Sequence, residues 1–371
     1  MKIDVITFHN VNNYGSVLQT YATQEKLREF GRVEIIDYCR FDQIDYHTQM
    51  QRALQNKKWN KIPFLRSVYK LIKAPSYIKQ SSVFGGFINK YIGLSEKRYI
   101  NYRELKNDPP KADVYCVGSD QMWNSDYNEG IELAFYLAFV PANKMKMSFA
   151  TSIGMMEFND AEGTEVSKLL QDFQHISVRE DCAVSALKKI GMRNVQLVLD
   201  PTLMLTRDEW RKLSTESFLS GKYVLMYQLN PNKEMDRFAQ RLAKEKNMKL
   251  IRIGLMYDHV AKVGRTVVLP EVTQFVSLID KAEYVVTDSF HGTAFCINFN
   301  KEFYVFNPPR FSSRINSILS LTNLTGRVIN TCPEVLDTKR RIDYSSVNQI
   351  INHERSVSNK FLSKAFMGNK E

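Results

Sequence analysis

The sequence predicts an α/β protein built from two Rossmann-like domains that face each other across a cleft. Short apolar runs, typical of buried strands, alternate along most of the chain with longer segments of helical periodicity. This alternation starts again after Thr202, and polar residues follow directly after several of the predicted strands. With 371 residues, the chain is long enough for two domains that each bury a core.

The first domain, residues 1–202, opens with a strand, a polar loop and a helix. The strand covers residues 2–8, the glycine-bearing loop covers 9–16, and the helix continues to about Phe30, where Gly31 can end it. Further strands are expected at 33–37, 113–117, 147–150, 175–178 and 195–199, with helices at 161–173 and 182–190.

Residues 46–110 interrupt this alternation with basic, aromatic and mostly helical sequence. Between Tyr46 and Ser95 there are nine Lys or Arg and no Asp or Glu, which supplies most of the net charge of +11. We interpret 46–110 as a helical basic insertion in the first domain rather than as another unit of the sheet. Such a basic patch is compatible with nucleic acid, an anionic membrane surface or an anionic substrate.

The second domain, residues 203–330, repeats the alternation, and the connection at 201–210 is the expected hinge. Strands are predicted at 223–228, 249–254, 284–287 and 302–306, with helices at 233–246, at 271–281 and from near 289. The remaining segment, residues 331–371, contains a helix at 345–366 that no strand follows, so it is free to cross back to the first domain.

Cysteine usage and the absence of common motifs exclude several classes of protein. The five cysteines are an odd number with no Cys-x-x-Cys pair, which argues against a disulfide framework or structural zinc and for a reducing compartment. The first residues form a strand that contains Asp4, so we expect no signal peptide. No Gly-x-Gly-x-x-Gly, phosphate-binding loop or His-Glu-x-x-His occurs, so we expect no metal, no cofactor and a cytoplasmic location.

The stretch 284–306 is the clearest candidate for a functional site. Asp288, Ser289 and His291 come directly after a predicted strand and begin a helix, where unpaired N–H groups favour an anion. Gly292 would let a ligand approach closely. The alternative is that Asp288 or Ser289 only caps the helix and that His291 is an ordinary surface histidine; spacing alone does not decide between the two.

Similar polar clusters follow other predicted strands. They are Asn13–Ser16, Gly118–Asn124 and Arg179–Asp181. Because ligands of open α/β sheets bind beyond the carboxyl ends of the strands, we expect these clusters to line one cleft.

Several of these segments resemble the polysaccharide pyruvyl transferase family. The resemblance rests on Asn-Tyr-Gly-Ser-Val-Leu-Gln (13–19), Val-Gly-Ser-Asp-Gln-Met-Trp-Asn (117–124), Ile-Ser-Val-Arg-Glu (176–180), Leu-Asp-Pro-Thr-Leu (199–203) and Thr-Asp-Ser-Phe-His-Gly-Thr (287–293). It extends from residue 3 to about residue 327 and does not cover the basic insertion. The family fold is similar to the two-domain glycosyltransferase architecture called GT-B, in agreement with the alternation of strands and helices.

The resemblance implies transfer of a pyruvyl group from phosphoenolpyruvate to two hydroxyls of a sugar, which forms a cyclic ketal and releases phosphate. The implied acceptor is a surface-polysaccharide precursor, in our reading carried on a polyprenyl diphosphate. His291 is then the expected acid and base, and Arg179 the bidentate clamp for the donor's carboxylate or phosphate. Some members carry arginine at the position of Ser289, so one anion contact must come from elsewhere, and Arg314 is the candidate.

The remaining residues expected to bind substrate lie in the matched motifs. They are Asn13, Tyr14, Gly15, Ser119, Asp120, Gln121, Trp123, Asp288, Ser289 and Gly292. Tyr14 and Trp123 are candidates to stack on a sugar, although aromatic residues at such loops often belong to the core. Asp120 either orients an acceptor hydroxyl or braces its turn, and Asp200, before a proline, reads as a turn or hinge residue.

Two other functions stay open at this point. One is a GT-B glycosyltransferase that uses a nucleotide sugar. The absence of the paired glutamates found in many retaining members counts against it. The other is a non-enzymatic binder of nucleic acid or membrane, suggested only by the basic stretch; we expect no nucleic acid partner.

The basic insertion contains one amphipathic segment, residues 64–74, after Pro63. Its apolar side holds Leu65, Val68, Tyr69 and Ile72, and its basic side holds Arg66, Lys70 and Lys73. Either this helix packs its apolar side on the core and leaves its lysines in water, or residues 52–79 lie on an anionic membrane surface.

Overall fold

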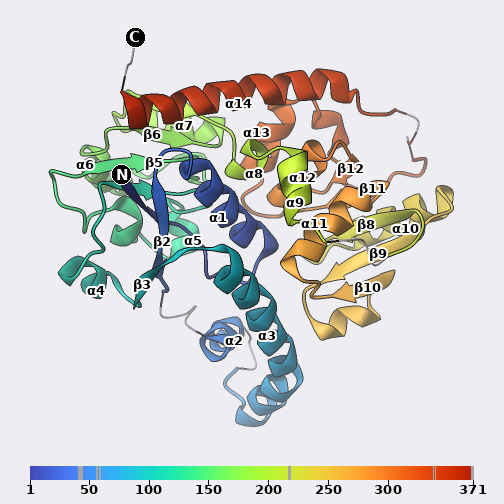
Figure 1. Cartoon of the computed structure of the whole chain (residues 1–371). Helices are drawn as coiled ribbons and strands as arrows, with labels where there is room; N and C mark the ends of the chain where they lie inside the picture. Colours follow the sequence, from blue (N-terminus) through green and yellow to red (C-terminus); the bar gives the residue numbers. More distant parts are fainter. Residues whose placement is uncertain are drawn as a thin grey trace.

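The computed structural model describes residues 1–40, 45–55, 57, 60–215, 219–336, 338 and 340–368, and it divides into two α/β halves (Figure 1). In this part of the chain each half contains a five-stranded parallel sheet. The order in the first sheet is β3 (Leu94–Tyr99), β2 (Arg32–Tyr38), β1 (Lys2–Ile6), β4 (Val114–Val117), β5 (Met145–Ser148). The order in the second is β10 (Arg265–Val268), β9 (Lys249–Gly254), β8 (Tyr223–Tyr227), β11 (Tyr284–Thr287), β12 (Glu302–Val305).

Both sheets reverse their strand order beside the first strand, between β1 and β4 and between β8 and β11. This reversal creates the crevice in which open α/β sheets bind ligands. A parallel pair, β6 (Ile176–Val178) and β7 (Val195–Leu197), continues the first sheet through a bridge from Thr151 to Val178. The prediction of an α/β protein with two Rossmann-like halves is confirmed.

Helices follow the strands in both halves. In the first half these are α1 (Tyr14–Leu27), α5 (Ser125–Asn128), α6 (Asp160–Leu170) and α7 (Asp181–Lys189). In the second half they are α10 (Lys233–Glu245), α11 (Val272–Lys281), α12 (Phe290–Asn298) and α13 (Ser313–Leu321). Asn13 begins α1 by accepting from Gly15 N, and Ser289 begins α12 by accepting from Gly292 N. Both residues supply the side-chain oxygen that the first turn of a helix needs.

Residues 46–110 are largely helical, but one segment of them joins the sheet. Helices α2 (Tyr46–Gln55), α3 (Pro63–Tyr91) and α4 (Tyr102–Asn107) match the expected insertion, whereas β3 pairs in parallel with β2. The expectation that no part of 46–110 belongs to the sheet was therefore wrong. The edge strand β3 carries charged, exposed residues at its centre, so it lacks the apolar run that identifies a buried strand. Lys58 and Trp59 lie outside the described residues.

The connection between the halves consists of α8 (Pro201–Met204), which is buried, and α9 (Arg207–Leu213), which buries Trp210 and Leu213 and exposes its charged residues. The Asn298 side chain donates to the carbonyl oxygens of Thr202 at 3.0 Å and Leu205 at 2.8 Å. These bonds satisfy backbone groups that could not otherwise be buried. Between the halves the Tyr14 ring stacks on Phe275 at 4.3 Å, within a core that both halves share. The hinge expected at 201–210 stays a prediction, with residues 201–205 buried and residues 206–209 exposed.

Helix α14 (Tyr344–Met367) runs across both halves at the top of Figure 1. Its Arg355 donates to the carbonyl oxygen of Leu203 at 2.8 Å, and its Ser358 accepts from Leu199 N at 2.9 Å. Near its end, Phe366 stacks on Phe30 of the first half at 4.8 Å. The helix thus contacts both the connection and the first half. No helix in the described part of the chain is long and apolar enough to span a bilayer.

Candidate active site

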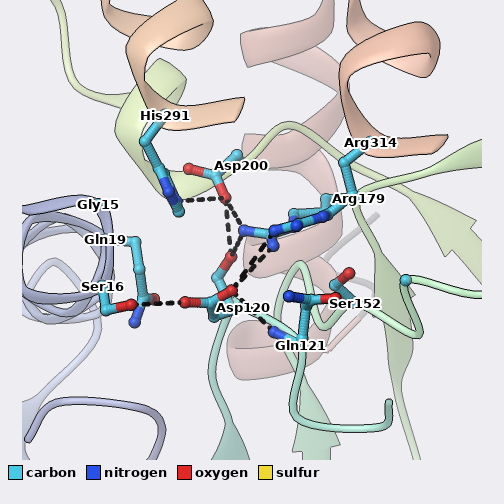
Figure 2. A network of polar contacts seen from close by, with 12 residues as sticks. Gly15, Ser16, Gln19, Asp120, Gln121, Ser152, Arg179, Asp200, His291 and Arg314 are labelled. Carbon is cyan, nitrogen blue, oxygen red and sulfur yellow. Dashed lines mark hydrogen bonds and ion pairs between the residues drawn. The ribbon is translucent and has the colours of Figure 1, made fainter. Parts of the chain in front are cut away.

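A cavity of about 340 Å³ lies where the strand ends of the two halves meet. From the first half it is lined by the predicted residues Asn13, Asp120 and Gln121, and from the second by Asp288, Ser289, His291 and Arg314. The polar clusters that follow separate strands are therefore brought together, as their positions at the carboxyl ends predicted. Figure 2 shows the polar network that forms one wall of this cavity.

Arg179 is the centre of this network and has no exposed side-chain surface. Its Nη1 donates to Asp200 Oδ2 at 2.6 Å and to Ser119 Oγ at 3.0 Å, and its Nη2 donates to Asp120 Oδ1 at 3.2 Å (Figure 2). The guanidinium lies 4.7 Å from the ring centre of Phe290. Burial would lower the pKa of Arg179, but the surrounding carboxylates raise it. Arg179 is therefore a buried cation that is matched by protein carboxylates.

Asp120 and Asp200 connect this cation to the helices around the cavity. Asp120 Oδ2 accepts from Ser16 Oγ of α1 at 2.9 Å, while Asp200 Oδ1 accepts from Thr202 N at 2.9 Å and so begins α8. Asp120 has φ of 80°, in the left-handed region that a residue other than glycine rarely adopts. Such backbone strain is typical of functional sites, because the surrounding contacts must hold it in place.

The imidazole of His291 fits between Asp200 and the first turn of α1. His291 Nε2 lies 3.9 Å from Asp200 Oδ2 and has no hydrogen-bond partner among the described residues. A Cβ atom at Gly15 would stand 2.1 Å from His291 Nδ1, so only glycine leaves room for the ring. His291 is 6 % exposed, and the alternative of an ordinary surface histidine is wrong.

Burial and charge keep the imidazole neutral and both carboxylates ionised. Burial lowers the pKa of His291 to about 4; Asp200 and Asp120 oppose this effect, and Arg179 adds to it. Burial would raise the pKa of Asp200, but Arg179 and His291 outweigh it and hold that pKa at about 2. The same cation keeps the pKa of Asp120 below its usual value despite burial. At neutral pH the histidine is therefore a free base beside two carboxylates.

Two arginines, Arg310 and Arg314, line the cavity, and Arg310 pairs with Asp126 at 3.2 Å. Arg314 is the more buried of the two. Its Nη1 lies 3.7 Å from Asp120 Oδ1, and its Nε has no partner within the described chain. Burial and the nearby Arg179 lower the pKa of Arg314. Arg314 thus has N–H groups to offer an anion. Arg179 already donates from Nη1 and Nη2 to protein oxygens, and only its buried Nε, 3.8 Å from Glu180 Oε2, has no hydrogen-bond partner among the described residues. The role of Arg179 as a donor clamp stays a prediction, which requires the donor to displace a carboxylate.

Asp288 and the residues after it hold the loops of the second half. Asp288 accepts from Leu229 N and Asn230 N, each at 2.7 Å, which ties β11 to the loop after β8. Burial raises the pKa of Asp288. A Cβ atom at Gly292 would stand 2.6 Å from Thr287 Oγ1, so this glycine allows the tight start of α12. Ser289 caps α12, as the alternative reading expected, and also faces the cavity.

Two aromatic residues expected to stack on a sugar are buried in the protein instead. Trp123 donates from Nε1 to the carbonyl oxygen of Phe135 at 2.8 Å and stacks on Tyr136. Tyr14 donates from its hydroxyl to the carbonyl oxygen of Pro270 at 2.6 Å and is fully buried against Phe275. The stacking prediction was wrong, because each ring already packs on another protein ring.

The sequence analysis assigned no role in this network to two of its carboxylates. Asp200 was read as a turn residue; it begins α8 and also binds Arg179. Glu180 Oε1 accepts from Ser152 Oγ at 2.7 Å and from two backbone N–H groups. Glu180 comes two residues after β6, within the predicted cluster Arg179–Asp181, and Asp200 comes three residues after β7. Position near a strand end, the signal that identified the other clusters, could have indicated the roles of both.

One further cluster in the described residues is compact enough to hold a metal ion. The ligand atoms of His9, Asp37 and Cys39 lie within 4.8 Å of one another. They also bond to each other, and Arg98 Nε donates to Asp37 Oδ2 at 2.8 Å. A cation would therefore have to compete with Arg98 for the carboxylate.

Comparison with known proteins agrees with this fold. The chain is similar to UDP-N-acetylglucosamine 2-epimerase from Rickettsia bellii, with 12 % identity, a TM-score of 0.55, and coverage of 100 % of this chain and 96 % of that one. It is also similar to the Neisseria meningitidis UDP-GlcNAc 2-epimerase bound to UDP-GlcNAc, with 11 % identity, a TM-score of 0.49, and coverage of 100 % and 95 %. The two-domain architecture is GT-B-like, as predicted.

By sequence, no curated protein matches the chain. The polysaccharide pyruvyl transferase family matches it over residues 13–309. This range contains the strand-end motifs and the cavity residues from Asn13 to Pro309. Because the match covers most of the chain, this protein is a transferase that belongs to the polysaccharide pyruvyl transferase family.

Proposed function

We propose that this protein transfers a pyruvyl group from phosphoenolpyruvate to two hydroxyls of a sugar in a lipid-linked precursor of a surface polysaccharide. The observation that carries the proposal is the buried imidazole of His291, whose Nε2 is unpartnered among the described residues beside a cavity with a cation. A proton acceptor and donor next to an anion-binding group is what this reaction requires.

The reaction needs one proton at carbon and releases another with phosphate. A proton is added to C3 of phosphoenolpyruvate as the first sugar hydroxyl forms a bond to C2. The second hydroxyl then bonds to C2 as the C2–O bond to phosphate breaks. The two hydroxyl protons end on the new methyl group and on the phosphate, so no oxidant or cofactor takes part. His291 is the group placed to pass these protons.

The charged residues divide the other tasks. Arg314 and the first N–H groups of α12 favour the donor's carboxylate or phosphate. Arg179 holds Asp120 and Asp200 in place, so Asp120 faces the cavity as an ionised acceptor for a sugar hydroxyl. The donor's negative charge raises the proton affinity of His291 and makes it an acid when the substrate is bound.

A nucleotide sugar is the competing donor. The epimerases named above share only 11–12 % identity with this chain, so the likeness concerns the fold and does not extend to their substrates. We further propose that the enzyme acts on the inner face of the cytoplasmic membrane, where a polyprenyl-diphosphate acceptor is accessible.

Acceptor-dependent phosphate release tests the proposal. The purified protein is incubated with phosphoenolpyruvate and with short sugar acceptors, water-soluble or lipid-linked, and the product is examined for a pyruvate ketal. His291→Ala should lower turnover by about two to four orders of magnitude, as expected for loss of a general acid or base. Arg193→Ala, outside the cavity, is the matched control. Turnover of a UDP-sugar without phosphoenolpyruvate would overturn the proposal.

A further inference from the structure

Helix α3 exposes an apolar side at its N-terminal end. Seven of the fourteen exposed large apolar side chains in the described part of the chain lie between Ile62 and Ile78. Phe64 is 73 % exposed, Leu71 79 % and Ile72 62 %. In Figure 1 this end of the helix projects below both halves of the molecule. A contiguous apolar surface of this kind on a soluble protein marks an interaction site.

Two polar residues of α3 contact the second half of the protein. Lys73 of α3 turns inward and pairs with Asp258 at 2.7 Å, and Ser76 accepts from Tyr257 N at 3.0 Å. At 3.6 residues per turn, Phe64 and Leu71 lie on the side of α3 opposite Lys73 and face solvent, and Ile72, nearer to Ser76, is also exposed. The interpretation in which Leu65, Val68, Tyr69 and Ile72 pack on the core is wrong for Leu65, Val68 and Ile72, which are 39 %, 36 % and 62 % exposed. These exposed apolar side chains at the N-terminal end of α3 do not stabilise the protein unless another surface covers them.

We infer that this apolar side of α3 inserts into the headgroup region of an anionic membrane and docks the enzyme there. The charges on and around the helix select this partner. Residues 46–95 contain nine Lys or Arg and no Asp or Glu, and Lys61, Arg66 and Lys70 belong to the projecting end. Apolar side chains with cations beside them are what an interfacial helix presents to anionic lipid.

Other occupants fit less well. A second copy of the chain would bring two sets of like charges together across the contact. Nucleic acid would be held by the cations and would leave Phe64, Leu71 and Ile72 in water, because phosphate contacts carry such binding. A membrane satisfies the apolar and the basic residues at once. The inference rests on the proposed function only in that a lipid-linked acceptor gives the enzyme a reason to dock.

Vesicle sedimentation without substrate tests this inference. The probes are phosphatidylcholine vesicles with and without phosphatidylglycerol, at low and high salt. The protein should sediment with anionic vesicles. The double variant Leu71→Ser and Ile72→Ser should bind about tenfold more weakly, since buried apolar area sets the binding of interfacial helices. Met156→Ser, which removes an exposed apolar side chain elsewhere, should bind as the wild type does.

Variants that lack the cations measure how much charge contributes to vesicle binding. Replacing Lys61, Arg66 and Lys70 by Gln should weaken binding to anionic vesicles by about three- to tenfold at low salt, and by less at high salt. All variants should have the same melting temperature as the wild type, because the altered side chains are exposed or half-buried. Pyruvyl transfer to a water-soluble acceptor should be unchanged, so failure of docking and failure of the proposed reaction are told apart.

Three results would overturn the inference. The first is a protein that stays in the supernatant with both kinds of vesicle. The second is binding that the double variant at Leu71 and Ile72 leaves undiminished. The third is a dimer in size-exclusion chromatography that the same variant abolishes, since a second copy would then be the occupant of the apolar side.

Discussion

Binding of phosphoenolpyruvate should move a proton onto His291. Burial lowers the pKa of this imidazole to about 4 in the free protein. At pH 7 about one molecule in a thousand then carries the proton, too few for the histidine to act as an acid. The donor brings a phosphate and a carboxylate into the cavity that His291 lines. Added negative charge favours the imidazolium, so binding and protonation are coupled.

The size of the effect follows from charge and distance. One uncompensated negative charge about 4 Å from the ring contributes on the order of 4 kcal/mol at an effective dielectric constant of 20. This corresponds to roughly a thousandfold gain in proton affinity, which would bring the pKa from about 4 to about 7. About half a proton should then be taken up at pH 7 and nearly one at pH 6.

Titration calorimetry in buffers with different heats of ionisation measures this uptake. The same titration on His291→Gln removes the imidazole and keeps a polar side chain of similar size. The donor's own phosphate contributes its proton equally to both proteins, so the difference isolates His291. Because the wild type takes up an additional proton, its donor affinity should rise relative to that of the variant as the pH falls from 8 to 6.

Equal proton uptake by the wild type and His291→Gln between pH 6 and 8 would refute this reasoning. It would mean that the donor's charge is neutralised by other groups, or that the donor does not lie beside the imidazole. A normal melting temperature of the variant shows that the comparison concerns the site and not the fold.

Three further predictions concern the same network. Arg179→Met should lower the free energy of unfolding in urea by about 3–5 kcal/mol, because it leaves buried carboxylates unpaired. Arg314→Met should change stability little and weaken donor binding about tenfold. Equal stability of the two variants would contradict this prediction. The pKa of Asp200 lies at about 2 instead of 3.8, so its ionisation contributes about 2 kcal/mol to the free energy of unfolding above pH 4, and this is lost as the pH falls toward 2. The difference in stability between the wild type and Asp200→Asn should therefore shrink in that range. Gly15→Ala should lower turnover at least about a hundredfold by displacing the neighbouring imidazole, while Gly85→Ala, where a Cβ atom meets no described atom within 4 Å, should leave turnover unchanged.

Local sequence patterns determined the class of this protein and the position of its site. The alternation of apolar runs and helical segments requires only neighbouring residues, so it predicted both parallel sheets apart from their edge strands β3 and β10. Strand ends in a parallel sheet meet at one edge, and the two domains were expected to face each other. Polar residues after strands of different sheets, such as Asp120 and His291, could therefore be assigned to one cleft. The family resemblance rests on these same strand-end motifs.

Only the tertiary structure decided what each of these side chains faces. Trp123 and Tyr14 occupy strand-end loops like the cavity residues, yet rings from distant parts of the chain cover them. Periodicity separated the apolar side of α3 from its basic side, but only the structure shows that Leu65 and Arg66, from the two sides, are both exposed while Lys73 pairs with Asp258 of the other half. Charge partners and packing come from residues far apart in the sequence, and a local pattern contains no information about them.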